Sequence, residues 1–275
     1  MSKITIKKIQ SWKNKKKFSA VTAYDFTTAQ IVDKSDIPIV LVGDSASMIT
    51  YGYDSTIPIT MEEILLLSRA VSRGVSSALV VGDMPFLSYQ QSVSMAVKNA
   101  GRFLKEGRVS AVKLEGGGKV KKHIRNIVDF GIPVMGHLGL TPQSVNQFSG
   151  YSVQGKDLAS AQKILDDARV VEESGAFAVV LECIPSALAE KITQTLSIPT
   201  IGIGSGPLCD GQIQVFHDIL GLISNFTPKH AKKFAALHNQ ALRALKKYNS
   251  SVEKQTFPNK SHTTNYKNNI VDKLH

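Results

Sequence analysis

Acidic residues stand at or near the ends of most of the short apolar runs in this sequence. They are Asp25, Asp44, Asp83, Glu115, Glu182 and Asp218. If these ends share one edge of a sheet, the carboxylates repel one another unless a cation neutralises them. A set of oxygen ligands with no cysteine and at most one histidine suits Mg²⁺ better than Zn²⁺. Each acid alone is more simply a cap for the next helix, but so many on successive runs favour a metal site.

The same apolar runs also contain two residues with reactive nitrogen atoms, Lys113 and His137. Lys113 precedes Glu115 by two residues, so in a strand both side chains point to the same face. A lysine inside a barrel must be paired or catalytic, because burial disfavours its charge. A Schiff-base role, as in a class I aldolase, is one hypothesis, although such an enzyme does not need the surrounding carboxylates. His137, in the sequence GHLGL, is either a hydrogen-bonded core histidine or a donor that faces a substrate.

A glycine-rich stretch, GIGSG at 202–206, follows the seventh apolar run. Barrels often bind phosphate after that strand. The stretch is not the GxGxxG that opens a helix in a dinucleotide-binding unit, so such a unit is poorly supported. We expect a tight turn or a close backbone approach to a ligand, both of which glycine permits.

The elements that must position these residues are eight apolar runs that alternate with longer amphipathic stretches. The runs are 18–23, 37–43, 77–82, 110–114, 132–138, 176–181, 198–204 and 213–218. Each is continuously apolar, which is typical of parallel strands buried on both faces. Helical patterns lie at 61–74, 92–107, 119–131, 157–175, 186–196 and 228–248. Right-handed crossovers between such strands predict an α/β fold with a single (β/α)₈ TIM barrel, and a doubly wound open sheet is the alternative.

The chain divides by composition into a barrel and a tail. We expect residues 1–248 to form the barrel, with a short basic segment at its start. Residues 249–275 are polar, rich in Lys and Asn, and aperiodic. Such a sequence predicts a C-terminal tail that is disordered or draped over the body.

The formal net charge of +11 raises the possibility of nucleic-acid binding, but the charge lies at the ends. Residues 1–20 carry +7 and residues 228–275 carry +8, which leaves −4 for the middle, where the motifs lie. A basic groove built into the fold would put positive charge beside the motifs. We therefore expect no nucleic-acid partner, and lysine-biased, solvated ends.

The remaining bulk features predict a cytoplasmic protein without membrane association. The N-terminal stretch has no apolar leader, and no apolar run approaches the roughly 20 residues that span a bilayer. Cys183 and Cys209 have no CxxC spacing and need no oxidising compartment.

A series of sequence blocks resembles the ketopantoate hydroxymethyltransferase family along nearly the whole chain. In order they are TAYD (22–25), VGDS (42–45), DSTIPIT (54–60), DMPF (83–86), KLEGG (113–117), PVMGHLGLTPQSVN (133–146), GYSVQGK (150–156), LECIP (181–185), IPTIGIGSG (198–206) and CDGQI (209–213). The resemblance implies a barrel of the phosphoenolpyruvate/pyruvate superfamily type. It also implies transfer of a one-carbon unit from 5,10-methylenetetrahydrofolate to 3-methyl-2-oxobutanoate. The product is 2-dehydropantoate, and this is the first committed step of pantothenate biosynthesis.

The resemblance assigns a metal set and a base. Asp44, Asp83 and Glu115 match the family's Mg²⁺ site, with Glu115 completing the shell through water. Glu182, in LECIP, matches the general base. In this chemistry a base removes the C3 proton of the oxoacid and Mg²⁺ stabilises the resulting enolate.

The resemblance also assigns residues to the oxoacid. They are Asp44, Ser45, Asp83, Lys113 and His137. Ser205 departs from the family pattern, which usually has Ala there. Family members are large cyclic homo-oligomers, commonly decamers, so we expect this chain to associate with itself. A carbon–carbon lyase or mutase of the same superfamily is the rival function.

Overall fold

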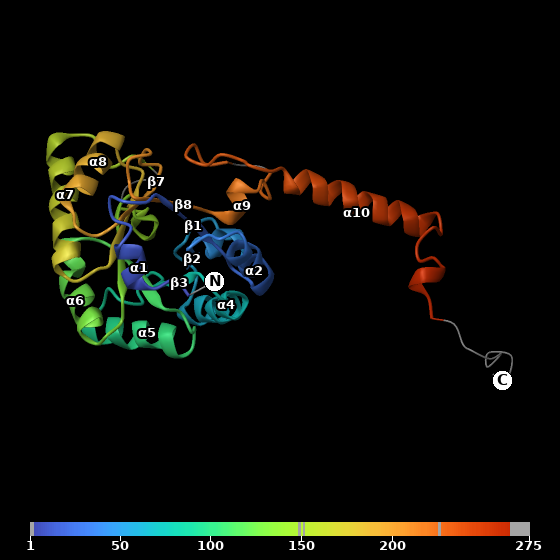
Figure 1. Ribbon diagram of the computed structural model, residues 1–275, viewed down its shortest axis with the longest axis horizontal. Helices are drawn as coiled ribbons and strands as arrows, with labels where there is room; N and C mark the ends of the chain where they lie inside the picture. The colour runs from blue at the N-terminus through green and yellow to red at the C-terminus, as the bar shows by residue number, and fades with distance from the viewer. Residues whose placement is uncertain (1–2, 148–149, 151, 225–226, 265–275) are drawn as a thin grey trace. The chain divides into compact units, whose positions relative to one another are not determined.

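The computed structural model describes residues 3–147, 150, 152–224 and 227–264. Eight parallel strands pair in chain order, and β1 pairs with β8 to close the barrel (Figure 1). They are β1 (Phe18–Thr22), β2 (Ile39–Val42), β3 (Leu79–Asp83), β4 (Ala111–Glu115), β5 (Val134–Gly139), β6 (Ala178–Glu182), β7 (Thr200–Ile203) and β8 (Gly211–Gln214). The predicted TIM barrel is confirmed, because an open sheet would leave β1 and β8 unpaired.

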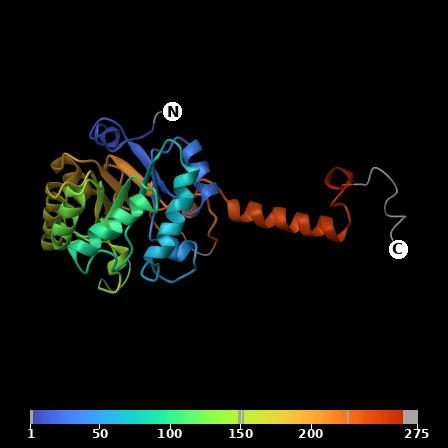
Figure 2. The same ribbon diagram turned by 90° about the horizontal axis from the view of Figure 1, so that it is seen from below.

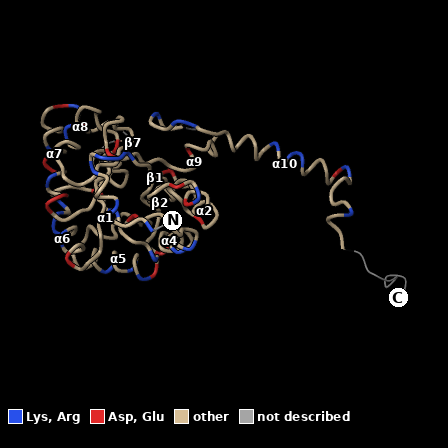
Figure 3. The backbone as a smooth tube through the Cα atoms, in the orientation of Figure 1, with Lys and Arg blue, Asp and Glu red and all other residues tan. Residues whose placement is uncertain are grey.

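The longer crossover helices surround the strands. They are α2 (Phe26–Lys34), α4 (Met61–Gly74), α5 (Val93–Lys105), α6 (Lys121–Asp129), α7 (Leu158–Glu173) and α8 (Ser186–Thr195). The predicted capping box begins α4, where the Thr60 hydroxyl accepts from the Glu63 N–H and the Glu63 carboxylate accepts from the Thr60 N–H. Figure 3 shows both signs of charge interspersed along α5, α6 and α7.

The N-terminal segment closes one end of the barrel (Figure 2). Helix α1 (Ile6–Gln10) delivers Ile9 and, just after it, Trp12 to the core cluster. There they join strand residues such as Phe18, Met135 and Ile201. A basic, solvated end was expected here. That expectation is wrong for the apolar residues of this segment. Its lysines are interspersed with apolar side chains that are buried in the core.

One crossover lacks a helix. Strand β8 follows β7 after the connection 204–210, and that connection, which is described in full, contains no helix. The eighth run was also misplaced, since β8 ends at Gln214 and the next residues begin the short helix α9 (Phe216–Ile219). The strict strand–helix alternation expected from the sequence therefore fails at the last crossover.

The chain divides into two compact units, the second formed by 217–227 and 232–275. The second unit contains α10 (Leu237–Glu253), which begins later and ends later than the predicted 228–248. Its last turn is extended by a hydrogen bond from Asn249 Nδ2 to Glu253 Oε1 at 2.8 Å. None of the helices in the described ranges is long and apolar enough to cross a membrane.

Candidate active site

Neighbouring strands bring five of the sequence-predicted side chains into the barrel interior. The strand registers place Asp83 beside Lys113 and Glu115 beside His137. Glu182 ends β6, which pairs with β5. Along each strand these residues continue, two positions further on, the series of side chains that fill the core. Lys113 and Glu115 therefore share a face, as expected from their spacing.

Lys113 and Asp83 form a buried ion pair. Lys113 Nζ donates hydrogen bonds of 2.7 Å to both carboxylate oxygens of Asp83. The Asp44 N–H donates to Asp83 Oδ2 at 3.1 Å, so the two aspartates lie at adjacent strand ends. Burial opposes the charge of Lys113, but the charges of Asp83, Asp44 and Glu115 outweigh it and hold the pKa of Lys113 above its ordinary value. The ammonium form is therefore favoured here.

His137 lies between two carboxylates. Its Nδ1 is 3.3 Å from Glu115 Oε1, and its Nε2 is 3.1 Å from Glu182 Oε2. Neither ring N–H is aligned for a well-formed hydrogen bond, so these contacts are ion pairs at close range. Burial and the Lys113 charge lower the pKa of His137, but the two carboxylates outweigh them and raise it to about 9. The ring is thus a cation at neutral pH, and it is not a plain core histidine.

Gln143 joins this group although the sequence analysis did not single it out. It lies in the 3₁₀ turn Pro142–Ser144 after β5, and its side chain is buried. Nε2 donates to Asp44 Oδ2 and to the Met84 carbonyl oxygen, each at 3.0 Å. Its backbone N–H donates to Glu115 Oε2 at 3.1 Å. The only signal for it was its place in the block GHLGLTPQSVN, because an amide carries no charge that would mark it.

Ser45 is at the edge of the group, partly exposed and next to Asp44. It precedes α3 (Ala46–Ile49) without capping that helix through its side chain. Its hydroxyl lies 2.8 Å from the Tyr24 hydroxyl. The backbone thus leaves the Ser45 hydroxyl available for a ligand, with Tyr24 as its neighbour.

The group holds more negative than positive charge. Its four carboxylates face two cationic groups, the Lys113 ammonium and the His137 ring. Burial raises the pKa of Glu115, and within the described ranges Glu115 Oε1 has no hydrogen-bond donor. Burial also raises the pKa of Asp83, to about 7, so positive charge is needed to keep these carboxylates ionised. A buried site with more carboxylates than cationic groups fits a divalent cation with oxygen ligands.

The carboxylates are not arranged around a common point where they could bind one cation. With Lys113 on both oxygens of Asp83, no three His, Cys, Asp or Glu side chains in the described part of the chain are grouped as a metal site requires. The residue types fit Mg²⁺, and its arrival would require Asp83 to share its oxygens.

Two of the acids do not have the structural setting expected from the sequence. Asp25 is exposed and caps α2, where its Oδ1 accepts from the Thr28 N–H at 2.8 Å. Asp218 lies in α9, so the expectation that it ends a strand was wrong. The simpler explanation, a helix cap, applies to Asp25.

The glycine-rich stretch after β7 is a tight turn, as expected. Gly204 and Gly206 have φ angles of 65° and 78°, which glycine adopts without strain. A Cβ on Gly206 would collide with the side chain of Ser186 at the start of α8. Between the glycines, the buried Ser205 hydroxyl donates to the Leu181 carbonyl oxygen at 2.8 Å, which ties the turn to the end of β6.

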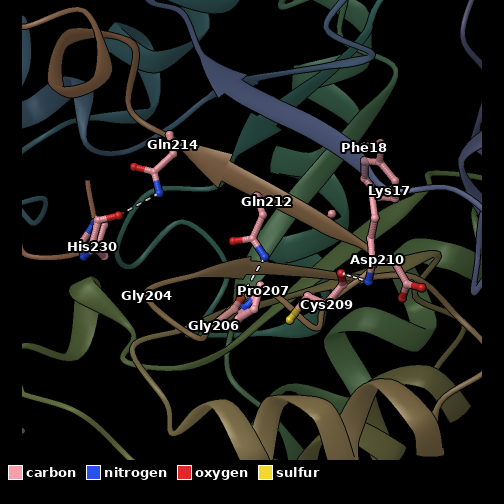
Figure 4. A pocket seen from close by; sticks show the side chains of 11 residues that line it. Lys17, Phe18, Gly204, Gly206, Pro207, Cys209, Asp210, Gln212, Gln214 and His230 are labelled. Atoms are coloured by element: carbon pink, nitrogen blue, oxygen red, sulfur yellow. Dashed lines mark hydrogen bonds between the residues drawn. The ribbon is translucent and has the colours of Figure 1, made fainter. Parts of the chain in front are cut away.

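A cavity of about 560 Å³ lies beside β8 (Figure 4), and its lining does not include the carboxylates of the candidate site. It is lined by Lys17, Phe18, Gly204, Gly206, Pro207, Cys209, Asp210, Gly211, Gln212, Gln214 and His230. The polar side chains labelled in Figure 4 are largely occupied by the protein itself. Gln212 donates to the Gly206 carbonyl oxygen and Gln214 to that of His230. None of the residues of the candidate site lines this cavity, so it is a separate feature.

The family model for ketopantoate hydroxymethyltransferase matches residues 3–260. The chain belongs to this family. The match covers all the side chains of the candidate site, and it confirms the resemblance found in the sequence.

Curated relatives agree with the family assignment. A 3-methyl-2-oxobutanoate hydroxymethyltransferase of Clostridium novyi is 52% identical over 99% of this chain and 100% of its own length. The corresponding protein of Carboxydothermus hydrogenoformans is 49% identical, with 100% of both chains covered. The chain is therefore an enzyme with the hydroxymethyltransferase activity of this family.

Solved structures with little sequence identity share the fold. Phosphonopyruvate hydrolase, crystallised with oxalate and Mg²⁺, matches with a TM-score of 0.62 and 11% identity over 98% of this chain and 94% of its own. A 2,3-dimethylmalate lyase of the PEP mutase/isocitrate lyase superfamily matches with a TM-score of 0.59 and 16% identity, covering 96% and 92%. The barrel is thus of the type found in that superfamily.

Proposed function

We propose that this enzyme transfers the one-carbon unit of 5,10-methylenetetrahydrofolate to C3 of 3-methyl-2-oxobutanoate, giving 2-dehydropantoate for pantothenate biosynthesis. The observation that carries the proposal is the buried group of four carboxylates, one ammonium and one imidazolium at the strand ends. Such a group suits the removal of a proton beside a ketone, because it combines a base with positive charge for the oxygen.

Asp44, Asp83 and Glu115 would hold Mg²⁺, the last through water. The fit rests on their oxygen donors, on their burial and on the excess of carboxylates over cationic groups around them. A bound Mg²⁺ supplies positive charge that polarises the ketone of a 2-oxoacid and favours its enolate. The barrel of phosphonopyruvate hydrolase accommodates the same ion together with oxalate.

Glu182 is the general base in this proposal. Its carboxylate has a side-chain exposure of 15%, more than the 2–3% of His137 and Glu115, so an arriving substrate can reach it. The cationic His137 ring lies 3.1 Å from its Oε2 and holds the carboxylate in place. Glu182 takes the C3 proton, and the resulting carbanionic carbon bonds to the methylene carbon of the folate as one C–N bond there breaks and its electron pair passes to nitrogen. Water then replaces the second nitrogen on this carbon, which supplies the hydroxyl oxygen of 2-dehydropantoate and releases tetrahydrofolate.

The oxoacid is positioned by polar and cationic groups. Lys113 offsets the negative charge that develops on the keto oxygen, while Ser45 donates its hydroxyl to the substrate carboxylate. Asp44 and Asp83 would act on the substrate indirectly, by holding the cation whose positive charge attracts the oxoacid. His137 completes the substrate site, on the side of Glu182.

The enzyme works as a homo-oligomer, as its family resemblance implies, and a decamer is the expected size. Helix α10 supports self-association, because no residue of this helix is buried within the chain. Its apolar residues Leu242, Leu245, Tyr248 and Val252 are 44–64% exposed. A second copy would cover such a face.

The proposal also includes a cytoplasmic location and no nucleic-acid partner. The second of these is supported by the mixture of acidic and basic positions along the barrel helices (Figure 3).

The deciding experiment is a transfer assay. Purified enzyme is incubated with 3-methyl-2-oxobutanoate and 5,10-methylenetetrahydrofolate, with and without Mg²⁺, and 2-dehydropantoate is measured by mass spectrometry. We expect Mg²⁺-dependent product. Cleavage of 2,3-dimethylmalate without any 2-dehydropantoate would instead assign the chain to the lyases that share its fold.

A further inference from the structure

Gln143 uses every hydrogen-bonding group of its buried side chain. Nε2 donates to Asp44 Oδ2 and to the Met84 carbonyl oxygen. Oε1 accepts from Gln90 Nε2 at 3.3 Å and lies 3.2 Å from the Tyr89 hydroxyl, whose one hydrogen it shares with the Glu115 carbonyl oxygen at 3.1 Å. Two donors and two acceptors are the full capacity of an amide, so the side chain has no polar group left for substrate.

The orientation of this amide is fixed by its partners. Asp44 Oδ2 and the Met84 carbonyl can only accept, so the NH₂ group must face them. A rotated amide would set its oxygen against those two acceptors and lose both bonds. Since the side chain is only 3% exposed, water cannot replace them.

The same residue reaches a second acid through its backbone. The Gln143 N–H donates to Glu115 Oε2, and the Tyr89 hydroxyl, which contacts Gln143 Oε1, also accepts from the Glu115 N–H at 3.1 Å. One oxygen of Asp44 and one oxygen of Glu115 are thus held by a single residue from the β5 loop. Their other oxygens, Asp44 Oδ1 and Glu115 Oε1, are not bound by Gln143.

We propose that Gln143 is a positioning residue for the divalent cation: it fixes the carboxylates of Asp44 and Glu115, so that one oxygen of each is presented to the ion. This inference rests on the cation site of the proposed function. Hydrogen-bonded partners of metal ligands commonly change metal affinity by about 10–100-fold when they are removed. Gln143 supports two ligands at once, from strands β2 and β4.

The test is cation binding to the substrate-free enzyme. Mn²⁺ serves as the probe, with free Mn²⁺ measured by electron paramagnetic resonance and Mg²⁺ added as competitor. Gln143→Met keeps the length of the side chain and removes the amide that holds Asp44, while the backbone N–H on Glu115 remains. The variant therefore tests the support of Asp44. We expect its Mn²⁺ dissociation constant to rise by about 10–100-fold. In the transfer assay the Mg²⁺ concentration that gives half-maximal rate should rise by a similar factor, and added Mg²⁺ should recover part of the lost rate. A rate lost through damaged packing would not be recovered by Mg²⁺.

Gln90→Met is the matched control, since Gln90 hydrogen-bonds Gln143 but neither carboxylate. We expect its Mn²⁺ affinity to stay within about 3-fold of wild type. Folding of each variant is checked by thermal unfolding and near-ultraviolet circular dichroism. If Gln143→Met does not fold, Gln143→Asn replaces it, because the shorter amide keeps polar atoms but cannot span to Asp44.

The outcomes separate the two proposals. Wild-type Mn²⁺ affinity in a folded Gln143 variant would overturn the positioning role alone. Failure of the wild type to bind Mn²⁺ would overturn this inference together with the cation site. Weakened Mn²⁺ binding in the variant, with a wild type that makes no 2-dehydropantoate, would support the positioning role and reject the proposed reaction.

Discussion

Lys113 Nζ lies 2.7 Å from each oxygen of Asp83, and strand register places the two residues side by side. A Schiff-base lysine must lose its proton to attack a carbonyl. The carboxylates around Lys113 hold its pKa above the ordinary value, so the free amine is scarce. We expect borohydride to trap no adduct between this enzyme and 3-methyl-2-oxobutanoate, as judged by intact-protein mass. A mass increase that Lys113→Arg abolishes would support the Schiff-base mechanism of a class I aldolase.

The proposed base is tested by Glu182→Gln. The amide keeps the shape of the side chain but cannot accept the C3 proton. We expect turnover to fall by about 10²–10⁴-fold, the usual contribution of a positioned general base. Exchange of the C3 hydrogen of 3-methyl-2-oxobutanoate with deuterated water, followed by NMR, isolates this step from folate chemistry. Wild-type exchange in the variant would show that another group takes the proton.

Binding separates a lost base from a damaged site. We expect Glu182→Gln to retain the Mn²⁺ affinity of the wild type, because Glu182 contacts His137 and is not in the proposed metal set. If the variant loses Mn²⁺ binding, Glu182 belongs among the ligands.

The excess negative charge of the site predicts that a divalent cation stabilises the fold. A ligand that binds only the folded state raises the free energy of unfolding by mass action. We expect Mg²⁺ to raise the midpoint of thermal unfolding in wild type and EDTA to reverse the rise. Asp44→Asn removes one negative charge from the proposed shell and should show little or no Mg²⁺-dependent shift. An unchanged shift in Asp44→Asn would exclude Asp44 as a ligand.

Asp33 gives a pH-dependent test outside the active site. Burial alone would raise the pKa of Asp33, but hydrogen bonds from Ser76, Ser77 and Ala78 outweigh it and hold the pKa well below its ordinary value. Its contribution to stability is therefore present above the unfolded-state pKa of about 4 and is lost as pH falls below it. We expect Asp33→Asn to be less stable than wild type at pH 7, with a difference that shrinks towards pH 3.

Urea unfolding at both pH values measures this difference. Asp129→Asn is the control, since Asp129 pairs with Arg125 on an exposed helix surface. We expect its stability to lie within about 1 kcal/mol of wild type at either pH. A deficit for Asp33→Asn that is the same at pH 3 and pH 7 would mean that the ionised form of Asp33 adds nothing.

The N-terminal closure of the barrel is tested by Trp12→Ala. Trp12 is 8% exposed and packs in the core cluster, tilted against Phe18 at a ring distance of 5.7 Å. We expect a loss of about 3–5 kcal/mol in the free energy of unfolding, the usual cost of truncating a buried large aromatic residue. Phe130→Ala, at a residue that is 72% exposed, should cost less than about 1 kcal/mol. Equal losses in the two variants would contradict a structural role for the N-terminal segment.

Much of the fold follows from local pattern. Continuous apolar runs located all eight strands, the last only in part, because buried parallel strands need no alternation. The last crossover could not be predicted in the same way. The run 213–218 is apolar enough for a strand, but Gly211 and Gln212 pair with β7 and the chain turns into α9 after Gln214. Pairing with a distant strand, not local composition, decided those limits.

The candidate site could likewise be predicted from the sequence only in part. Charged residues at strand ends were visible in the sequence, and Asp83, Lys113, Glu115 and His137 lie together as the strand order requires. Gln143 was not visible, because its role arises from five hydrogen bonds to other segments of the chain. The cap formed by Asp25 shows the converse, since a carboxylate at a strand end can serve only the next helix.

The contacts of the N-terminal segment also bear on how this chain acquires its structure. Lys13 and Asn14 both bond to the buried Asp210, 197 and 196 positions away, at 2.9 Å each. These two hydrogen bonds of the N-terminal segment therefore form only once the chain just before β8 is in place. Contacts of such long range slow folding, because the chain must close a large loop before the contacts stabilise it. Until β8 forms, the apolar cluster that covers Ile9 and Trp12 lacks Ile213, and a strongly basic stretch of chain carries two apolar side chains whose core is still incomplete.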